Sequence, residues 1–323
     1  MRKGNCFVVA VFGVLFSLSS LYAHTNSAEE LYQKGVSSFR EKDYESSALY
    51  FRKAAELGHV EAQGELGTFY VNGIGVDKSF EEALKWHRKS AEQGYSSAQY
   101  NLGLYYDRGV GVSQSYEEAA KWFLKAAEQG HVSAQSYLGD YYAKGKGVVQ
   151  SYEESAKWLR KAAEQGCADA QYNLAVSYCN GEGVPQSYEE SVKWLRKAAE
   201  QGSAAAQFNL AVSYYNGEGV PQSYKMAAKW SYEAAMQGVP NAQTLLGLLF
   251  AQGKGVPKSY TNAIKLYYAA AEQEYADAQY YLGVAFEKDL GVSKSKNESV
   301  KWYRKAAAQG HEKAQLKLKS LTK

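Results

Sequence analysis

The sequence is poor in the features that mark several protein classes. Its 323 residues include only 4 Pro and 3 Cys, and 37 Lys+Arg against 34 Asp+Glu leave a formal net charge of +3. Scarce Pro excludes a collagen-like chain, and scarce Cys excludes a disulfide scaffold. The balanced charge provides no basic surplus for nucleic acid or an acidic lipid surface. A hydrophobic content of 46% argues against wholesale disorder.

Glycine and tyrosine are abundant by contrast, with 29 Gly and 28 Tyr in the chain. This composition favours many helices that end at glycine and use aromatic side chains for packing. The length allows about two ordinary domains or one elongated repeat array.

The first 23 residues have the pattern of a secretory signal. Arg2 and Lys3 precede an apolar run from Phe7 to Leu21, and the chain turns polar after Ala23. We predict cleavage after Ala23 and an exported protein, either periplasmic or secreted. An uncleaved membrane anchor is the alternative, but the run is shorter than the roughly 20 residues that span a bilayer.

Two cysteines, Cys167 and Cys179, remain after this segment. They flank one predicted helix, in which their separation corresponds to about 18 Å. A disulfide requires Cα atoms within about 7 Å of each other. We therefore expect two unpaired and mostly buried thiols.

The dipeptide Ala-Gln recurs with a constant period of 36 residues. Its alanines are Ala62, Ala98, Ala134, Ala170, Ala206, Ala242, Ala278 and Ala314. A leucine four residues later, a Gly-x-Gly-Val loop and a tryptophan recur in the same register in most units, and a Lys-Ala-Ala-Glu-Gln-Gly segment matches most units at many of its positions. A fixed period of this length indicates stacked supersecondary units.

Each unit has the pattern of two helices. The first begins near Ala-Gln, and the second opens with a Ser-x-x-Glu capping box such as Ser79 and Glu82. A small residue in the first helix, for example Gly67 or Ala175, lowers helix propensity. It therefore predicts that a neighbouring helix approaches closely at that point.

These motifs resemble the Sel1-like repeat family, which is related to the tetratricopeptide repeats. Residues 62–313 contain seven such units, and residues 314–323 begin a further helix that caps the C-terminal end. Residues 24–61 resemble a tetratricopeptide unit, with an interhelix loop shorter by four residues, and form an N-terminal cap. The resemblance implies an all-α, right-handed α-solenoid.

The residue types that could support catalysis have structural explanations. The Gly-x-Gly loops follow helices, whereas a nucleotide-binding fingerprint follows a strand. His59, His131 and His311 share one repeat position, too far apart to bind one metal ion, which favours a helix-capping or turn role. We predict no enzymatic activity, no cofactor and no metal site.

The resemblance implies that the first helices line a concave groove. Residues that vary there within a constant frame are candidates for partner binding. The candidates are Tyr100, Arg108, Asp140, Tyr172, Asn180, Phe208, Asn216 and Tyr280. Aromatics beside Asn and Arg suit an extended protein segment; the alternative is that the aromatics pack between units.

The resemblance also implies adaptor roles in bacterial envelope complexes, in signalling or in host contact. We predict a monomeric scaffold that binds a protein or peptide, without nucleic acid and with possible association with membrane complexes. Some cysteine-rich relatives bind β-lactams and hydrolyse them weakly, but those carry a cysteine pair in each repeat. That activity and a purely structural envelope spacer are the alternatives.

Overall fold

A computed structural model describes residues 27–321, in which every regular element is a helix. The predicted signal segment, residues 1–23, lies outside the described residues. The first helices of successive pairs are residues 27–40, α3 (Val60–Asn72), α5 (Ser96–Arg108), α7 (Val132–Lys144), α9 (Ala168–Asn180), α11 (Ala204–Asn216), α13 (Pro240–Gln252) and α15 (Ala276–Lys288). The second helices are α2 (Tyr44–Glu56), α4 (Phe80–Glu92), α6 (Tyr116–Glu128), α8 (Tyr152–Glu164), α10 (Tyr188–Glu200), α12 (Tyr224–Met236), α14 (Tyr260–Ala271) and α16 (Lys296–Ala308). A last helix, α17 (Glu312–Leu321), follows the eighth pair.

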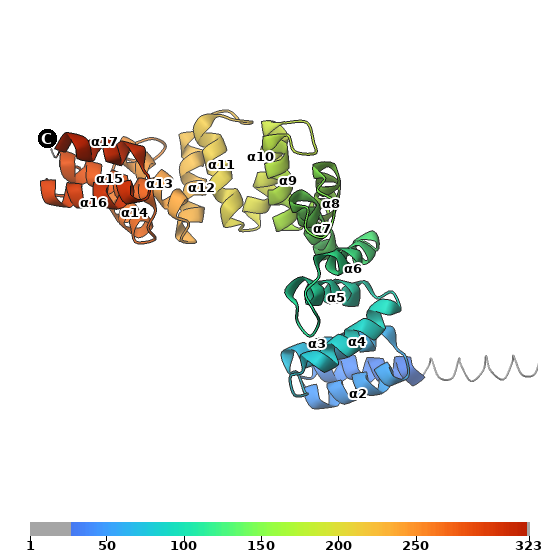
Figure 1. Cartoon of the computed structure of the whole chain (residues 1–323). Helices are drawn as coiled ribbons and strands as arrows, with labels where there is room; N and C mark the ends of the chain where they lie inside the picture. The colour runs from blue at the N-terminus through green and yellow to red at the C-terminus, as the bar shows by residue number, and fades with distance from the viewer. Residues whose placement is uncertain (1–26, 322–323) are drawn as a thin grey trace, which may run out of the picture. The chain divides into compact units, whose positions relative to one another are not determined.

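The fold is an all-α solenoid, in which consecutive helices pack against each other from α2 to α7 and from α9 to α17 (Figure 1). The contacts divide this array into two compact units, Met1–Trp158 and Leu159–Lys323, which we call unit 1 and unit 2. Inside most pairs, seven residues such as 73–79 join the two helices. Only residues 41–43 do so in the first pair, which confirms the loop predicted to be four residues shorter.

Most second helices begin at a serine cap that the sequence predicted, and some first helices begin at a histidine cap, whereas α5, α9, α13 and α15 have no side-chain cap bond. The N–H of Glu82 donates to Oγ of Ser79 over 3.2 Å, and the same cap recurs at later second helices. The N–H groups of Ala62, Ala134 and Ala314 donate to Nδ1 of the histidines three residues before them, over 3.1–3.2 Å. These contacts confirm the capping role of His59, His131 and His311, since each satisfies a backbone donor at a helix start.

The constant Ala-Gln dipeptide joins each first helix to the pair before it. Ala62 is fully buried, and Nε2 of Gln63 donates to the carbonyl of Ala55 at the end of α2. Oε1 of Gln63 in turn accepts from Nε2 of Gln93 over 2.7 Å. Equivalent bonds recur in unit 2, for example from Gln201 to Gln171. The glutamine therefore satisfies a helix-end carbonyl inside the interface between pairs.

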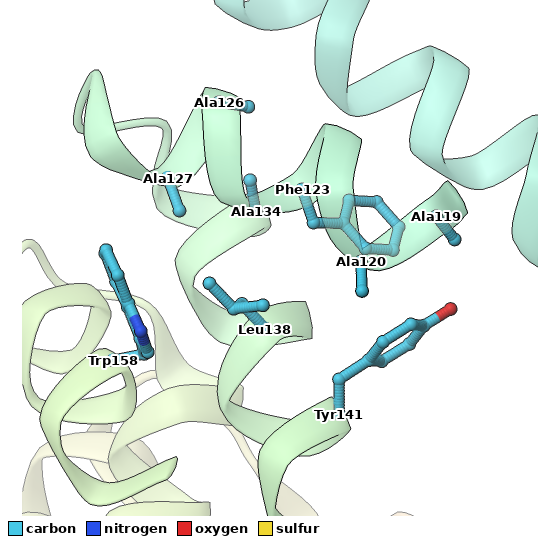
Figure 2. Close-up of a cluster of buried hydrophobic side chains, with 9 residues drawn as sticks. All are labelled: Ala119, Ala120, Phe123, Ala126, Ala127, Ala134, Leu138, Tyr141 and Trp158. Carbon is cyan, nitrogen blue, oxygen red and sulfur yellow. The ribbon is translucent and has the colours of Figure 1, made fainter. Parts of the chain in front are cut away.

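The hydrophobic core lies between pairs. In the layer of Figure 2, α6 contributes Phe123, α7 contributes Leu138 and Tyr141, and α8 contributes Trp158, with five alanines around them. Each layer thus needs two successive pairs, because one pair cannot bury its own apolar faces.

Small residues permit the close helix contact within a pair, as predicted. A Cβ added to Gly67 would lie 2.6 Å from Cδ2 of His87, and one added to Gly103 would lie 2.5 Å from Cε1 of Phe123. In the fifth pair, Ala175 stands at the equivalent position and packs with Leu195. Glycine is thus required where the second helix presents a ring, and alanine suffices opposite leucine.

Both remaining cysteines are free, as predicted, but they are half-buried rather than mostly buried. Cys167 occupies the N-cap position of α9, and Cys179 is the last but one residue of the same helix. Both positions therefore lie at helix ends, away from the core layers.

Candidate functional site

The eight predicted binding residues all lie on first helices, but they differ in exposure. Arg108, Asn180 and Asn216 are exposed at the ends of α5, α9 and α11. Asp140 in α7 forms an ion pair of 2.6 Å with Lys144, one turn further on. The aromatic members, Tyr100, Tyr172, Phe208 and Tyr280, are half-buried.

The predicted aromatics make contacts between pairs. The ring of Tyr100 stacks on His131 with centroids 4.7 Å apart, and Tyr280 stacks on His311 at 4.6 Å. The hydroxyl of Tyr172 accepts a 3.5 Å hydrogen bond from Nδ2 of Asn209 in the next first helix. These contacts support the alternative role in packing, and the binding role of these side chains stays a prediction.

The Tyr100–His131 contact has a counterpart one repeat earlier, in which the first residue is small and the second is large. Gly64 takes the place that Tyr100 has in the next pair, and a Cβ added there would lie 2.7 Å from the Tyr95 ring. Tyr95 in turn takes the place of His131. A large residue on one side of the junction is thus matched by a small one on the other, as interior packing density requires.

Three pockets open between successive first helices, at the same place in the repeat. The unit 1 pocket has a volume of about 220 Å³ and is lined by Thr68, Val71, Asn72, Phe80, His87, Asn101, Leu104, Tyr105, Arg108 and Val110. The central pocket of unit 2, of about 330 Å³, is lined by Tyr172, Val176, Cys179, Asn180, Tyr188, Ser191, Leu195, Asn209, Val212, Ser213 and Glu218. The terminal pocket of unit 2, of about 200 Å³, is lined by Leu248, Ala251, Tyr260, Ala263, Ile264, Tyr267, Tyr281, Val284, Ala285 and Leu290.

The three pockets share a construction. Two successive first helices form the walls, and the second helix of the earlier pair supplies the buried base, His87 in unit 1 and Leu195 in the central pocket. Of the predicted residues, Arg108 lines the unit 1 pocket, and Tyr172 and Asn180 line the central pocket. Tyr100, Asp140, Phe208, Asn216 and Tyr280 line none of these three pockets.

His87 gives the unit 1 pocket a polar base. Its Nδ1 lies 2.8 Å from the Tyr105 hydroxyl, and its Nε2 lies 3.2 Å from Nδ2 of Asn101 and 3.3 Å from Oγ1 of Thr68. Burial lowers the pKa of His87 from 6.5 to about 4, because the charged imidazolium would lose its hydration. The ring is therefore neutral at pH 7 and serves as a hydrogen-bonding group.

Sequence reasoning missed His87, Asn101, Asn209 and Glu218. His87 occupies a position of the second helix where other pairs have Phe123, Leu195 or Tyr267, so comparing the units along the second helix would have found it. Asn101 and Asn209 share one position of the first helix, directly after the predicted aromatic residues Tyr100 and Phe208. The pocket linings come from first helices, second helices and loops. Residues that vary between repeats at any of these positions are therefore candidates for lining a pocket.

Residues 27–321 contain no group of three or more His, Cys, Asp or Glu placed to hold a metal ion. Across the same part of the chain, no helix has both the length and the apolar character needed to cross a membrane.

The family model of the Sel1 repeat matches eight consecutive segments that together cover residues 21–311. The first segment, residues 21–59, includes most of the region that resembles a tetratricopeptide unit in sequence. The search of curated proteins found no match.

Two solved structures resemble the chain in both sequence and fold. A protective antigen of uropathogenic Escherichia coli strains, described as displaying an SLR fold, is 37% identical with a TM-score of 0.86, over 94% of this chain and 67% of that one. A Sel1 repeat protein from Oxalobacter formigenes is 33% identical with a TM-score of 0.65, over 99% of this chain and 95% of that one. With eight matched repeats and these relatives, the chain belongs to the Sel1 repeat family.

Proposed function

We propose that this chain is an exported scaffold that binds a protein partner through the face formed by its first helices, and that it has no enzymatic activity of its own. Sel1 repeats commonly mediate protein–protein interaction. The observation that carries the proposal is the series of three pockets at one repeat position, each with a constant construction and a different lining. Such variation within a constant frame allows discrimination between partners.

Exposed polar residues provide the test of this face. A variant with Arg108→Ala, Asn180→Ala and Asn216→Ala changes three exposed first-helix residues. A matched control with Arg88→Ala, Asn262→Ala and Asn297→Ala changes the same residue types at exposed positions of second helices. Both variants should retain the circular dichroism of the wild type, because surface substitutions usually change stability by about 0.5 kcal/mol or less.

The partner is first recovered by cross-linking in the native cell and then purified for calorimetry. We expect saturable binding to the wild type and the control, with at least tenfold weaker binding to the first-helix variant. Equal affinity for both variants contradicts the assignment of the face. Absence of any saturable partner contradicts the scaffold role and favours a structural spacer.

Export is part of the proposal and rests on the signal pattern of residues 1–23. Mass spectrometry of the protein from its native cell should find His24 as the first residue, in a periplasmic or extracellular fraction. An intact N-terminus in the cytoplasmic fraction would contradict export.

We also propose that the protein is a monomer and that its partner belongs to a membrane-associated complex. Light scattering of the purified chain tests the monomeric state, and membrane fractionation of the cross-linked complex tests the membrane association.

A further inference from the structure

The two pockets of unit 2 occupy equivalent places two repeats apart. Val176 and Val212 of the central pocket correspond to Leu248 and Val284 of the terminal pocket, and Glu218 corresponds to Leu290. Both pockets lie on the first-helix face of one compact unit. A single extended ligand can therefore reach both.

The terminal pocket is fitted for an apolar side chain. Its lining is aliphatic or aromatic throughout, and Tyr267 and Tyr281 stack there with ring centroids 5.2 Å apart. The pocket contains no charged residue. A leucine, isoleucine or phenylalanine side chain that enters it loses contact with water and gains contacts with these walls.

The central pocket combines amides with one acidic group. Asn180 and Asn209 lie on successive first helices, and the Asn180 amide has no hydrogen-bond partner within residues 27–321. A side-chain amide offers both a donor and an acceptor, which match the carbonyl and N–H of a peptide backbone. The Asn180 amide can therefore hold the backbone of an extended chain, beside Asn209, whose Nδ2 already donates to the Tyr172 hydroxyl.

Glu218 is the charged residue of the central pocket. Its carboxylate accepts one hydrogen bond, of 3.3 Å from Nδ2 of Asn216, and forms no salt bridge within the described part of the chain. Glu182 occupies the same loop position one repeat earlier. Within this pocket, the Glu218 carboxylate favours a cationic side chain over an acidic one.

We propose that the first-helix face of unit 2 binds an extended peptide with a Lys or Arg side chain at the central pocket and an apolar side chain in the terminal pocket. The inference rests on the proposed function. Helices pack about 8–10 Å apart, so two repeats span roughly 20 Å. An extended chain advances about 3.3 Å per residue, which places the two side chains about six residues apart, in either chain direction.

A random twelve-residue peptide library displayed against the immobilised full chain tests this inference. The enriched peptides contain Lys or Arg and an apolar residue about six positions apart. Synthetic copies of them bind at least tenfold more weakly to Glu218→Lys and to Leu248→Asn, whereas Arg88→Glu, an exposed position of the second helix α4, leaves their affinity unchanged. Selection against Glu218→Lys shifts the enriched basic residue to Asp or Glu.

Three results overturn the inference. Enriched peptides whose affinity is unaffected by Glu218→Lys and Leu248→Asn bind elsewhere, which leaves the proposed function standing. Concentration-dependent dimers that Glu218→Lys dissociates assign the face to a second copy of this chain. Absence of any enriched peptide contradicts the proposal that this face binds an extended peptide. Calorimetry with the purified partner then tests the scaffold role separately.

Discussion

The unit 1 pocket and the central pocket of unit 2 are the same construction with different chemistry. Each lining residue of the unit 1 pocket except Arg108 has its counterpart, 108 residues later, in the lining of the central pocket. Asn72 and Asn180, and likewise Asn101 and Asn209, are identical, whereas His87 becomes Leu195 and Val110 becomes Glu218. The arrangement of the helices thus stays constant while the side chains that line the pocket change.

The contrast extends to the residue opposite the base. Gly67 faces the ring of His87, and Ala175 packs with Leu195. A base residue therefore changes together with its partner on the first helix, since the pair must fill the same volume. This coupling predicts which substitutions break one pocket and spare the other.

Among the changes considered, acidification should lower stability the most, and the loss should occur in unit 1. Burial lowers the pKa of His87 from 6.5 to about 4, so the unfolded chain binds a proton that the folded chain excludes between these values. The stability contributed by neutral His87 is present above about pH 6.5 and is lost as the pH falls toward 4, by about 3 kcal/mol. Amide hydrogen exchange should show α4 and α5 losing protection before α10 and α11.

His87→Phe provides the control, because Phe123 fits the same frame opposite Gly103. Burial also lowers the pKa of His131, which this variant retains, so the difference between wild type and variant isolates His87. An unchanged pH dependence in His87→Phe would show that His87 is not the responsible group.

A methyl group at Gly67 should have the next largest effect. In Gly67→Ala the new Cβ lies 2.6 Å from the His87 ring, and overpacking of this kind costs about 2 kcal/mol. The double substitution Gly67→Ala with His87→Leu recreates the Ala175 and Leu195 pair and should recover most of the loss. Urea denaturation of the single and double variants measures this coupling, and simple additivity of the two changes would refute it.

Loss of the serine caps should affect both pockets equally. Ser79 and Ser187 each accept a 3.2 Å hydrogen bond from the N–H three residues later, at the start of the second helix beneath each pocket. Ser79→Ala and Ser187→Ala should each lower the free energy of unfolding by about 1 kcal/mol. A difference larger than the error of urea denaturation would mean that the two frames are not equivalent.

Substitution of the exposed pocket residues Arg108 and Glu218 should have the smallest effect on stability. Arg108→Asn gives the unit 1 pocket the residue found at Asn216, and Glu218→Val gives the central pocket the residue found at Val110. We expect each change to alter the unfolding free energy by about 0.5 kcal/mol or less. Thermal denaturation checks this, and a larger loss would show that these side chains support the fold.

Much of the fold follows from the sequence because its determinants are local and repeated. The Ala-Gln period, the serine and histidine caps and the loop glycines specify helix starts, helix ends and the pairing of neighbours. Gly73 at φ +70° and Ser79 at the next cap illustrate this, since each acts within a few residues of its own position. The shorter loop at residues 41–43 was predictable for the same reason.

The tertiary structure decided which side chains remain available on the first-helix face. From the sequence, Tyr100 and Tyr280 are equally suited to a ligand or to a neighbouring helix; their stacking on His131 and His311 depends on how the next pair packs. His87, Asn101 and Glu218 line pockets for the same reason, because a pocket forms only where two successive pairs meet. The repeated unit thus follows from local sequence, whereas the exposed surface follows from the packing between units, since residues of the next pair cover Tyr100 and Tyr280.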